Sequence, residues 1–231
     1  MRVRVATTAL GLTAVAVLAL PACSTHASQA KPASPSAAPT GNPAAAEQSK
    51  APLSSAALQP RLLDESDLGP GYTRKPEAPV QHDDVTVLGC PALTKLGEAA
   101  TGGSLDFPRQ AKTTFTYTGG SDSQLSEELY SDTPAKLSDG TGRIFDAMTG
   151  CPTYQVVSGS TAIDVTSQKT AAPRLGDEQF SQLLTFSTGG QDSIVKQTAI
   201  RDGNLLLVVS GSPALVDQHL GKALAKATAT R

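Results

Sequence analysis

The chain has 231 residues, of which 39% are hydrophobic and 17% are charged, and its formal net charge is -2. These values fit one globular domain with appended segments, and they leave no charged field to attract nucleic acid or anionic lipid. Only 4% of the residues are aromatic and none is Trp, so a stacking platform for single-stranded nucleic acid is not expected. We predict that nucleic acid is not a partner.

Residues 1–22 are predicted to be a signal peptide. Arg2 and Arg4 form a positive amino-terminal region, and residues 5–20 form an uncharged apolar stretch, which is the order typical of export signals. A retained transmembrane anchor is an alternative. However, Pro21 interrupts the stretch before it reaches the roughly 20 residues that a comfortable span requires.

The stretch Leu20-Pro21-Ala22-Cys23 resembles the lipobox of bacterial lipoproteins, in which the cysteine is acylated and becomes the mature amino terminus. By that resemblance Cys23 is the lipidation site, and the protein contacts the membrane through its amino-terminal lipid, for example palmitate. Ordinary cleavage after Ala30 is the alternative, because Ser28 and Ala30 also satisfy the small-residue rule.

Residues 23–55 are predicted to form the lipidated cysteine followed by a disordered linker. Ala, Ser, Pro and Thr dominate this segment, and it has no aromatic residue, so it cannot bury enough apolar surface to fold. Frequent prolines favour extended conformations of about 3 Å per residue. We therefore expect an exported lipoprotein of the cell envelope, lipid-anchored to the outer face of the cell membrane, with its folded domain at residues 56–231.

Cys90 and Cys151 are the other two cysteines of the chain. If Cys23 is acylated, they remain as an even pair in an oxidising compartment, where structural disulfides form. A zinc site or a catalytic thiol is the alternative, but neither cysteine has a second cysteine within four residues or a nearby His. We predict a Cys90 to Cys151 disulfide bond.

The first half of the domain is predicted to contain three helices and two or more strands. A short helix over Leu58–Leu63 is closed by the acidic run 64–67, and a second helix starts at Pro91 with apolar residues at helical spacing. Residues 111–118 and 124–130 alternate as a strand pair. Thr133-Pro134 gives the cap and first turn of a third helix, which ends at Gly150.

The second half of the domain is predicted to consist mainly of strands. Asp202-Gly203 is a strong hairpin signal, because a tight primed turn needs positive φ angles. Leu205–Val209 is continuously apolar, so that strand should be covered on both faces. Ser212-Pro213 opens a final helix. The expected strands are 153–158, 161–168, 180–188, 193–201 and 204–210. This order predicts a single α+β domain, a mostly antiparallel sheet with helices packed on it.

Several short motifs could carry chemistry, but none has the required context. Residues 193–196 match the SxxK pattern, yet a strand points residues three apart to opposite faces. Residues 158–160 and 210–212 are expected to be loops because GxSxG is absent. His82-Asp83-Asp84 is expected to be an exposed loop, because consecutive side chains rarely converge on one metal ion. His26 is expected to be solvated in the linker.

The remaining candidates are one histidine and four carboxylates. His219 is expected at the surface, on the shoulder of the last helix's apolar stripe, without an acid or nucleophile partner. The carboxylates could perform glycoside chemistry if the fold spaced them correctly, but solvated edges and turns are the expected positions. They are Glu127, Glu128, Asp177 and Glu178. We therefore predict a protein that is not an enzyme, with no catalytic residue, metal site or cofactor.

Three stretches together resemble a known family: Leu62-Leu63 followed by 67–72, the helix end at Gly150-Cys151, and 175–178 before a strand pair. They are similar to actinobacterial lipoproteins that resemble the extracellular sensor domain of PknH-type serine/threonine kinases. The chain lacks the cysteines for that family's frequent second disulfide. It also has Met148 where a Trp is often found.

The resemblance implies a twisted antiparallel sheet with helices and a cleft proposed to bind a small envelope ligand. We therefore expect a non-catalytic, sensor-like domain that binds a small or lipidic molecule through residues that the sequence does not identify. A scaffolding lipoprotein that binds another envelope protein, along a sheet edge for example, is the alternative.

Overall fold

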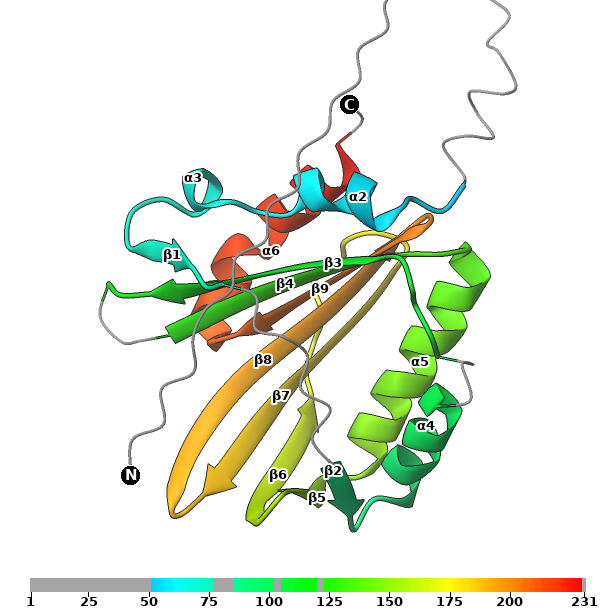
Figure 1. Cartoon of the computed structure of the whole chain (residues 1–231), viewed down its shortest axis with the longest axis vertical. Coiled ribbons are helices and arrows are strands. Elements are labelled where there is room, and N and C mark those ends of the chain that lie inside the picture. The colour runs from blue at the N-terminus through cyan, green and yellow to red at the C-terminus, as the bar shows by residue number, and fades with distance from the viewer. Residues whose placement is uncertain (1–50, 77–84, 102–104, 120–122, 230–231) are drawn as a thin grey trace, which may run out of the picture. The chain divides into compact units, whose positions relative to one another are not determined.

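The computed structural model describes residues 51–76, 85–101, 105–119 and 123–229. Its centre is a nine-stranded sheet in the order β1-β3-β4-β9-β8-β7-β6-β5-β2 (Figure 1), and each neighbouring pair is antiparallel. The strands are β1 (Tyr72–Arg74), β2 (Val85–Leu88), β3 (Gln110–Tyr117), β4 (Ser123–Ser131), β5 (Thr153–Ser158), β6 (Thr161–Lys169), β7 (Glu178–Thr188), β8 (Gln191–Asp202) and β9 (Leu205–Gly211). The predicted α+β class is confirmed.

Helices pack on both faces of the sheet's central strands. The helices are α2 (Ser55–Leu58), the 3₁₀ turn η1 (Gln59–Arg61), α3 (Glu65–Leu68), α4 (Pro91–Thr101), α5 (Pro134–Gly150) and α6 (Pro213–Thr228). In β9, Leu205, Leu207 and Val209 join the core cluster that contains α6. Leu206 and Val208 belong to the cluster that contains α5. We call these two sides the α6 face and the α5 face.

Local sequence signals set most element ends. The Thr133 hydroxyl accepts a hydrogen bond from the Lys136 N–H at the start of α5, and Pro134 occupies the first turn, as predicted. The β8–β9 hairpin turns at Gly203, whose φ is 57°, a left-handed conformation that glycine adopts without strain. Ser212 precedes α6, although its side chain makes no capping hydrogen bond.

The amino-terminal elements differ from the prediction. Helix α2 ends at Leu58 and only a 3₁₀ turn follows, whereas a helix over residues 58–63 was expected. Asp64 does not close that helix but opens α3, because its carboxylate accepts from the N–H groups of Ser66 and Asp67. The Asp67 carboxylate accepts in return from the Asp64 N–H. This reciprocal capping box satisfies helix-end donors, so the acidic run starts a helix.

The disulfide between Cys90 and Cys151 is present, as predicted. Cys90 precedes α4 and Cys151 follows α5, so the bond ties the start of one helix to the end of the other. The two helices also pack on each other. The covalent link therefore fixes one end of α5, the helix that covers the α5 face.

Loss of this bond is expected to destabilise the domain. The cysteines are 61 residues apart, and closing a loop of that length in the unfolded chain corresponds to about 4 kcal/mol in the chain-entropy treatment. The double variant Cys90→Ala/Cys151→Ala should therefore lower the free energy of unfolding by about that amount, measured by chemical denaturation. An unchanged unfolding midpoint would show that the bond does not constrain the native domain.

The α6 face contains a buried carboxylate. Glu127 is 0% exposed, and its Oε2 accepts a hydrogen bond of 2.7 Å from the Leu63 N–H, while Oε1 has no partner among the described residues. Burial raises the pKa of Glu127 to about 7, with the Leu63 hydrogen bond opposing the rise. The expectation that Glu127 is solvated is wrong, because residues 53–68, which we call the amino-terminal cover, lie over it.

Substitution of Glu127 by Gln should flatten the pH dependence of stability. A folded-state pKa of about 7 against an ordinary value of 4.5 means that the wild-type domain loses stability as pH rises through this window. The linkage amounts to about 2 kcal/mol between pH 5 and pH 8. In the Glu127→Gln variant this loss should disappear, as measured by urea unfolding at both pH values.

The comparison isolates Glu127 because the other titrating groups are common to both proteins. Asp146→Asn, which removes an exposed carboxylate on α5, controls for the loss of a negative charge and should keep the wild-type pH slope. Parallel curves for wild type and Glu127→Gln would contradict a raised Glu127 pKa.

Candidate functional site

The α5 face changes from apolar to polar along the three central strands. Strand register places Tyr130, Glu128 and Ser126 of β4 opposite Leu206, Val208 and Ser210 of β9, and the same face continues onto β8. In β4 and β9 the side chains are apolar or aromatic at one end and hydroxylated at the other, whereas in β8 the polar Gln197 and the apolar Val195 lie between Ala199 and Ser193. The positions on this face are Tyr130, Glu128 and Ser126; Leu206, Val208 and Ser210; and Ala199, Gln197, Val195 and Ser193.

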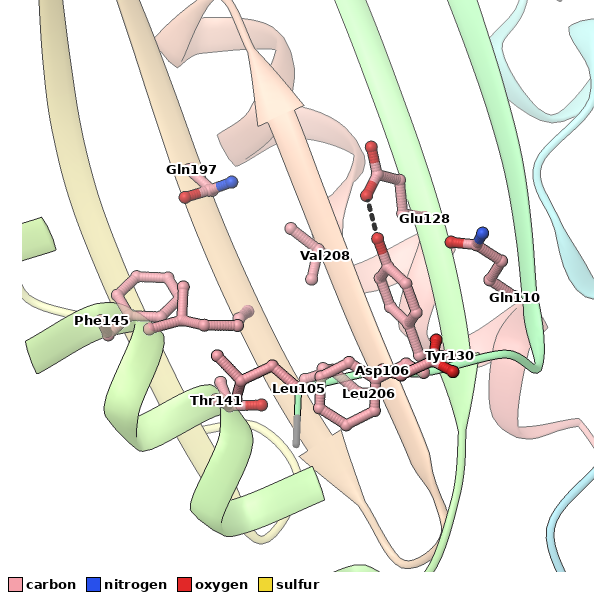
Figure 2. Close-up of a pocket in the computed structure, with 13 residues that line it drawn as sticks. Leu105, Asp106, Gln110, Glu128, Tyr130, Thr141, Phe145, Gln197, Leu206 and Val208 are labelled. Carbon is pink, nitrogen blue, oxygen red and sulfur yellow. Dashed lines mark hydrogen bonds between the residues drawn. The ribbon is translucent and has the colours of Figure 1, made fainter. Parts of the chain in front are cut away.

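The apolar end of this face is hollowed into a chamber of about 420 Å³. Its floor is formed by the sheet, and its walls are helix α5 and the segment 105–107 (Figure 2). We call it the apolar chamber. Its apolar and aromatic lining residues are Leu105, Phe107, Tyr130, Ile144, Phe145, Ala199, Leu206 and Val208.

Phe107 forms one wall of the chamber by packing against a glycine of α5. A Cβ atom at Gly140 would lie 2.4 Å from Cζ of Phe107, so only glycine permits this approach. The Phe107 ring meets Tyr130 edge-on at 5.9 Å, and the Lys136 ammonium lies 5.5 Å from the ring centroid. Lys136 also donates to the Asp106 carbonyl at 2.6 Å. These contacts hold the segment 105–107 against α5.

A hydroxyl group in the chamber wall has no partner. Thr141 is 3% exposed, and its Oγ1 makes no hydrogen bond to a described residue. Figure 2 shows Thr141 on the α5 side of the chamber, near Leu105 and Leu206. Buried hydroxyl groups are normally hydrogen-bonded, because leaving one unsatisfied costs about 1–3 kcal/mol. The Thr141 hydroxyl is therefore an unsatisfied polar group beneath the chamber wall, and its oxygen is enclosed and not open to the cavity.

Glu128 stands at the boundary between the apolar and polar ends. The Tyr130 hydroxyl donates a hydrogen bond to one Glu128 oxygen (Figure 2), and the Lys112 ammonium pairs with the other at 2.5 Å. Burial, and then the adjacent Glu128 carboxylate, raise the pKa of Tyr130 far above its ordinary value. Tyr130 therefore remains a protonated donor, and the Glu128 charge is balanced by Lys112.

A second hollow of about 640 Å³ also includes Glu128 in its lining. It lies at the hydroxylated end of the α5 face, where β8 continues beyond the last residue that pairs with β9. We call it the polar hollow. Its lining residues are Lys112, Thr114, Ser123, Gln124, Ser126, Glu128, Ser193, Ile194, Val195, Ser210, Gly211 and Ser212.

The structure does not join the candidate catalytic carboxylates into a pair. Glu127 and Glu128 are neighbours in β4 and therefore point to opposite faces of the sheet. Asp177 and Glu178 both bind the Arg201 guanidinium, each at 2.9 Å. The expected edge or turn positions hold for Asp177, which is exposed, while Glu178 is half-buried.

The SxxK pattern is divided in the same way. Ser193 lines the polar hollow, whereas Lys196 forms an ion pair with Asp217 of α6 at 2.5 Å. Ser193 and Lys196 therefore lie on opposite faces of the sheet, as predicted for residues three apart in a strand. The motif at 158–160 is at the turn between β5 and β6, as expected. The expectation of a loop at 210–212 is wrong, because Ser210 and Gly211 are the last residues of β9 and pair with β4 and β8.

His219 is not a surface residue, which corrects the sequence prediction. It is 5% exposed, and its Nε2 lies 2.7 Å from the Tyr72 hydroxyl. Burial lowers the pKa of His219. The apolar stripe of α6 is wider than expected because the edge strand β1 brings Tyr72 over it.

Several sequence candidates lie outside the described residues, namely Cys23, His26 and His82-Asp83-Asp84. Within the described residues, no group of three or more His, Cys, Asp or Glu side chains could hold a metal ion. No helix in that part of the chain is long and apolar enough to cross a bilayer.

The comparisons with known proteins rest on structure alone. No protein-family model and no curated protein matches the sequence. The structure is similar to the crystal structure of the extracellular domain of PknH from Mycobacterium tuberculosis, with a TM-score of 0.56 and 12% identity over 77% of this chain and 98% of that one. An X-ray structure of the Rv0999 ortholog from Mycobacterium smegmatis also matches, with a TM-score of 0.39 and 12% identity over 71% and 93% of the two chains. The first likeness confirms the resemblance in fold to the PknH-type sensor domain.

Gly140→Ala should displace Phe107 and loosen the chamber wall. The added methyl group would overlap the ring, and overpacking of this kind typically costs about 1–3 kcal/mol. The matched control is Gly142→Ala, on the same helix, where a Cβ meets nothing within 4 Å. That control should be neutral or stabilising, because alanine is the better helix former. Thermal unfolding of both variants tests this, and equal melting temperatures would contradict the close packing.

Proposed function

We propose that this protein is an exported lipoprotein whose domain, residues 56–231, is a non-catalytic, sensor-like module that binds a small or lipidic molecule of the cell envelope. The apolar chamber is the proposed binding site. The observation that carries the proposal is a concave chamber of about 420 Å³ whose apolar and aromatic side chains are joined by a few polar ones, namely Asp106, Gln110, Glu128, Thr141 and Gln197.

The chamber has the properties of a small-molecule site. Such sites are concave, usually several hundred Å³ in volume, and lined by apolar and aromatic side chains with a few polar groups that orient the ligand. The volume of about 420 Å³ and the lining fit this description. Two carboxylates line the chamber. Glu128 is engaged by Tyr130 and Lys112, and Asp106 is exposed. Neither is a buried, free carboxylate, which favours a binding role over acid–base chemistry.

The proposed location rests on the amino-terminal sequence. Residues 1–22 would direct export, Cys23 would carry the lipid, and the rest of 23–55 would separate the domain from the membrane surface. The disulfide Cys90–Cys151 supports an oxidising compartment. The likeness in fold to a domain that is extracellular in PknH supports the same location.

Native mass spectrometry of the protein extracted gently from its own membranes tests both parts of the proposal. We expect an acylated Cys23 at the amino terminus and an additional noncovalent mass that is lost on denaturation. The additional mass should be reduced in Gly140→Ala and kept in Gly142→Ala, because only the first substitution meets Phe107.

Two outcomes would count against the proposal. An amino terminus at another residue without acylation would refute the lipid anchor. If no mass accompanies the wild-type protein, the chamber is not a ligand site under native conditions, and the alternative of an envelope protein partner becomes the better hypothesis.

A further inference from the structure

The apolar chamber and the polar hollow share a wall, and this arrangement specifies a class of ligand. Glu128 lines both cavities. We propose, on the basis of the function proposed above, that they form one binding site for an amphipathic molecule with a neutral, polyhydroxylated head group. Its apolar part occupies the apolar chamber, and its head group occupies the polar hollow.

The continuity of the two cavities follows from the strands beneath them. Along β9 the α5 face passes from Leu206 and Val208 in the chamber to Ser210 in the hollow. Strand β4 makes the same change, from Tyr130 to Ser126, and β8 begins with Ala199 in the chamber and reaches Ser193 in the hollow by way of Gln197 and Val195. Because alternate residues of a strand lie on one face, the three strands form a single floor. A molecule lying along them meets apolar side chains at one end and hydroxyl groups at the other.

The polar hollow offers hydroxyl groups that have no partner within the described chain. The side chains of Ser193, Ser210 and Ser212 line it and make no hydrogen bond to another described residue. Ser212 stands at the N-cap position of α6 without capping it. A serine hydroxyl both donates and accepts, so a cluster of them complements hydroxyl groups of a ligand.

The charged side chains that line the hollow pair with each other, and a further cation outside the lining, the Lys75 ammonium, donates to the Gln124 side chain at 3.2 Å. Lys112 and Glu128 are the charged residues in its described lining, and they pair with each other at 2.5 Å. Neither is therefore left to attract a charged head group. Because these two charges neutralise each other, the lining favours a neutral head group over an anionic phosphate or a cationic amine.

The start of α6 also borders the hollow, and helix amino termini can attract anions. Here most of the usual donors are absent or engaged. Pro213 has no N–H group, and the N–H groups of Leu215 and Val216 bind the Ser212 carbonyl at 3.0 and 3.1 Å. The Ser212 N–H binds the Gln124 carbonyl. The helix end therefore does not provide the set of free amides that a phosphate requires.

Titration calorimetry with matched single-chain amphiphiles tests the inference. The probes are dodecyl maltoside, dodecylphosphocholine and dodecyl phosphate, each below its micelle concentration, together with maltose alone. The protein is the full-length Cys23→Ala chain, purified without detergent. We expect dodecyl maltoside to bind about ten-fold or more tightly than the other probes, since each added hydrogen bond contributes up to about that factor.

Two sets of variants identify the contacts. The double variant Ser193→Ala/Ser210→Ala should weaken the binding of dodecyl maltoside by about five-fold or more, because it removes only hydroxyl groups. The affinity for dodecylphosphocholine should stay unchanged. The control Ser160→Ala lies in the exposed β5–β6 turn and should change neither. Gly140→Ala should weaken all three amphiphiles, because it alters the chamber that holds their common tail.

The outcomes distinguish this inference from the function on which it rests. Equal affinities for all three amphiphiles, all weakened by Gly140→Ala, would overturn the head-group inference and support the apolar chamber. Tightest binding of dodecyl phosphate would overturn it in favour of an anionic head group. If no amphiphile binds, or if Gly140→Ala changes nothing, the proposed function itself fails.

Discussion

Successive side chains of a β-strand point to opposite faces, and the central strands of this sheet must satisfy a different environment on each face. In β9, Leu205, Leu207 and Val209 fill the core beneath α6, while Leu206 and Val208 between them line the candidate site. Strand β4 obeys the same rule with Glu127 and Glu128. A shift of one residue in register would exchange the two faces, so the core and the candidate site depend on the same pairing.

Glu127 shows how the amino-terminal cover is fixed to the sheet. Its carboxylate accepts the Leu63 N–H, a donor that the turn between η1 and α3 would otherwise leave buried. Around this contact the leucines of the cover pack into the core. Ion pairs add to this packing, since Lys226 of α6 pairs with Asp64 at 2.8 Å and also with Asp67. The carboxylate gives the cover one defined position, whereas leucine packing alone would tolerate several.

The fold was predictable from the sequence to the extent that its signals are local. Thr133-Pro134 and Asp202-Gly203 act on their own neighbours, and the apolar run of β9 reveals coverage on both faces without knowledge of the partners. The prediction that the acidic run at 64–67 ends a helix was wrong, because the same residue types can also cap the start of the next helix. The prediction that His219 lies at the surface was wrong because its partner, Tyr72, comes from an edge strand that is distant in the sequence.

The candidate site could not be predicted in the same way, because it is made by contacts between distant segments. The sequence does not indicate why α5 has glycine at position 140, because Phe107, which packs against it, comes from a segment outside the helix. The change from apolar to hydroxylated residues is present in β4 and β9 separately, but only the register places the two strands side by side. A further consequence concerns timing: in an exported chain, the Cys90–Cys151 bond that fixes α5 forms only after the chain leaves the reducing cytoplasm. In a chain exported as proposed, the α5 wall of the chamber would therefore be fixed covalently only outside the cytoplasm.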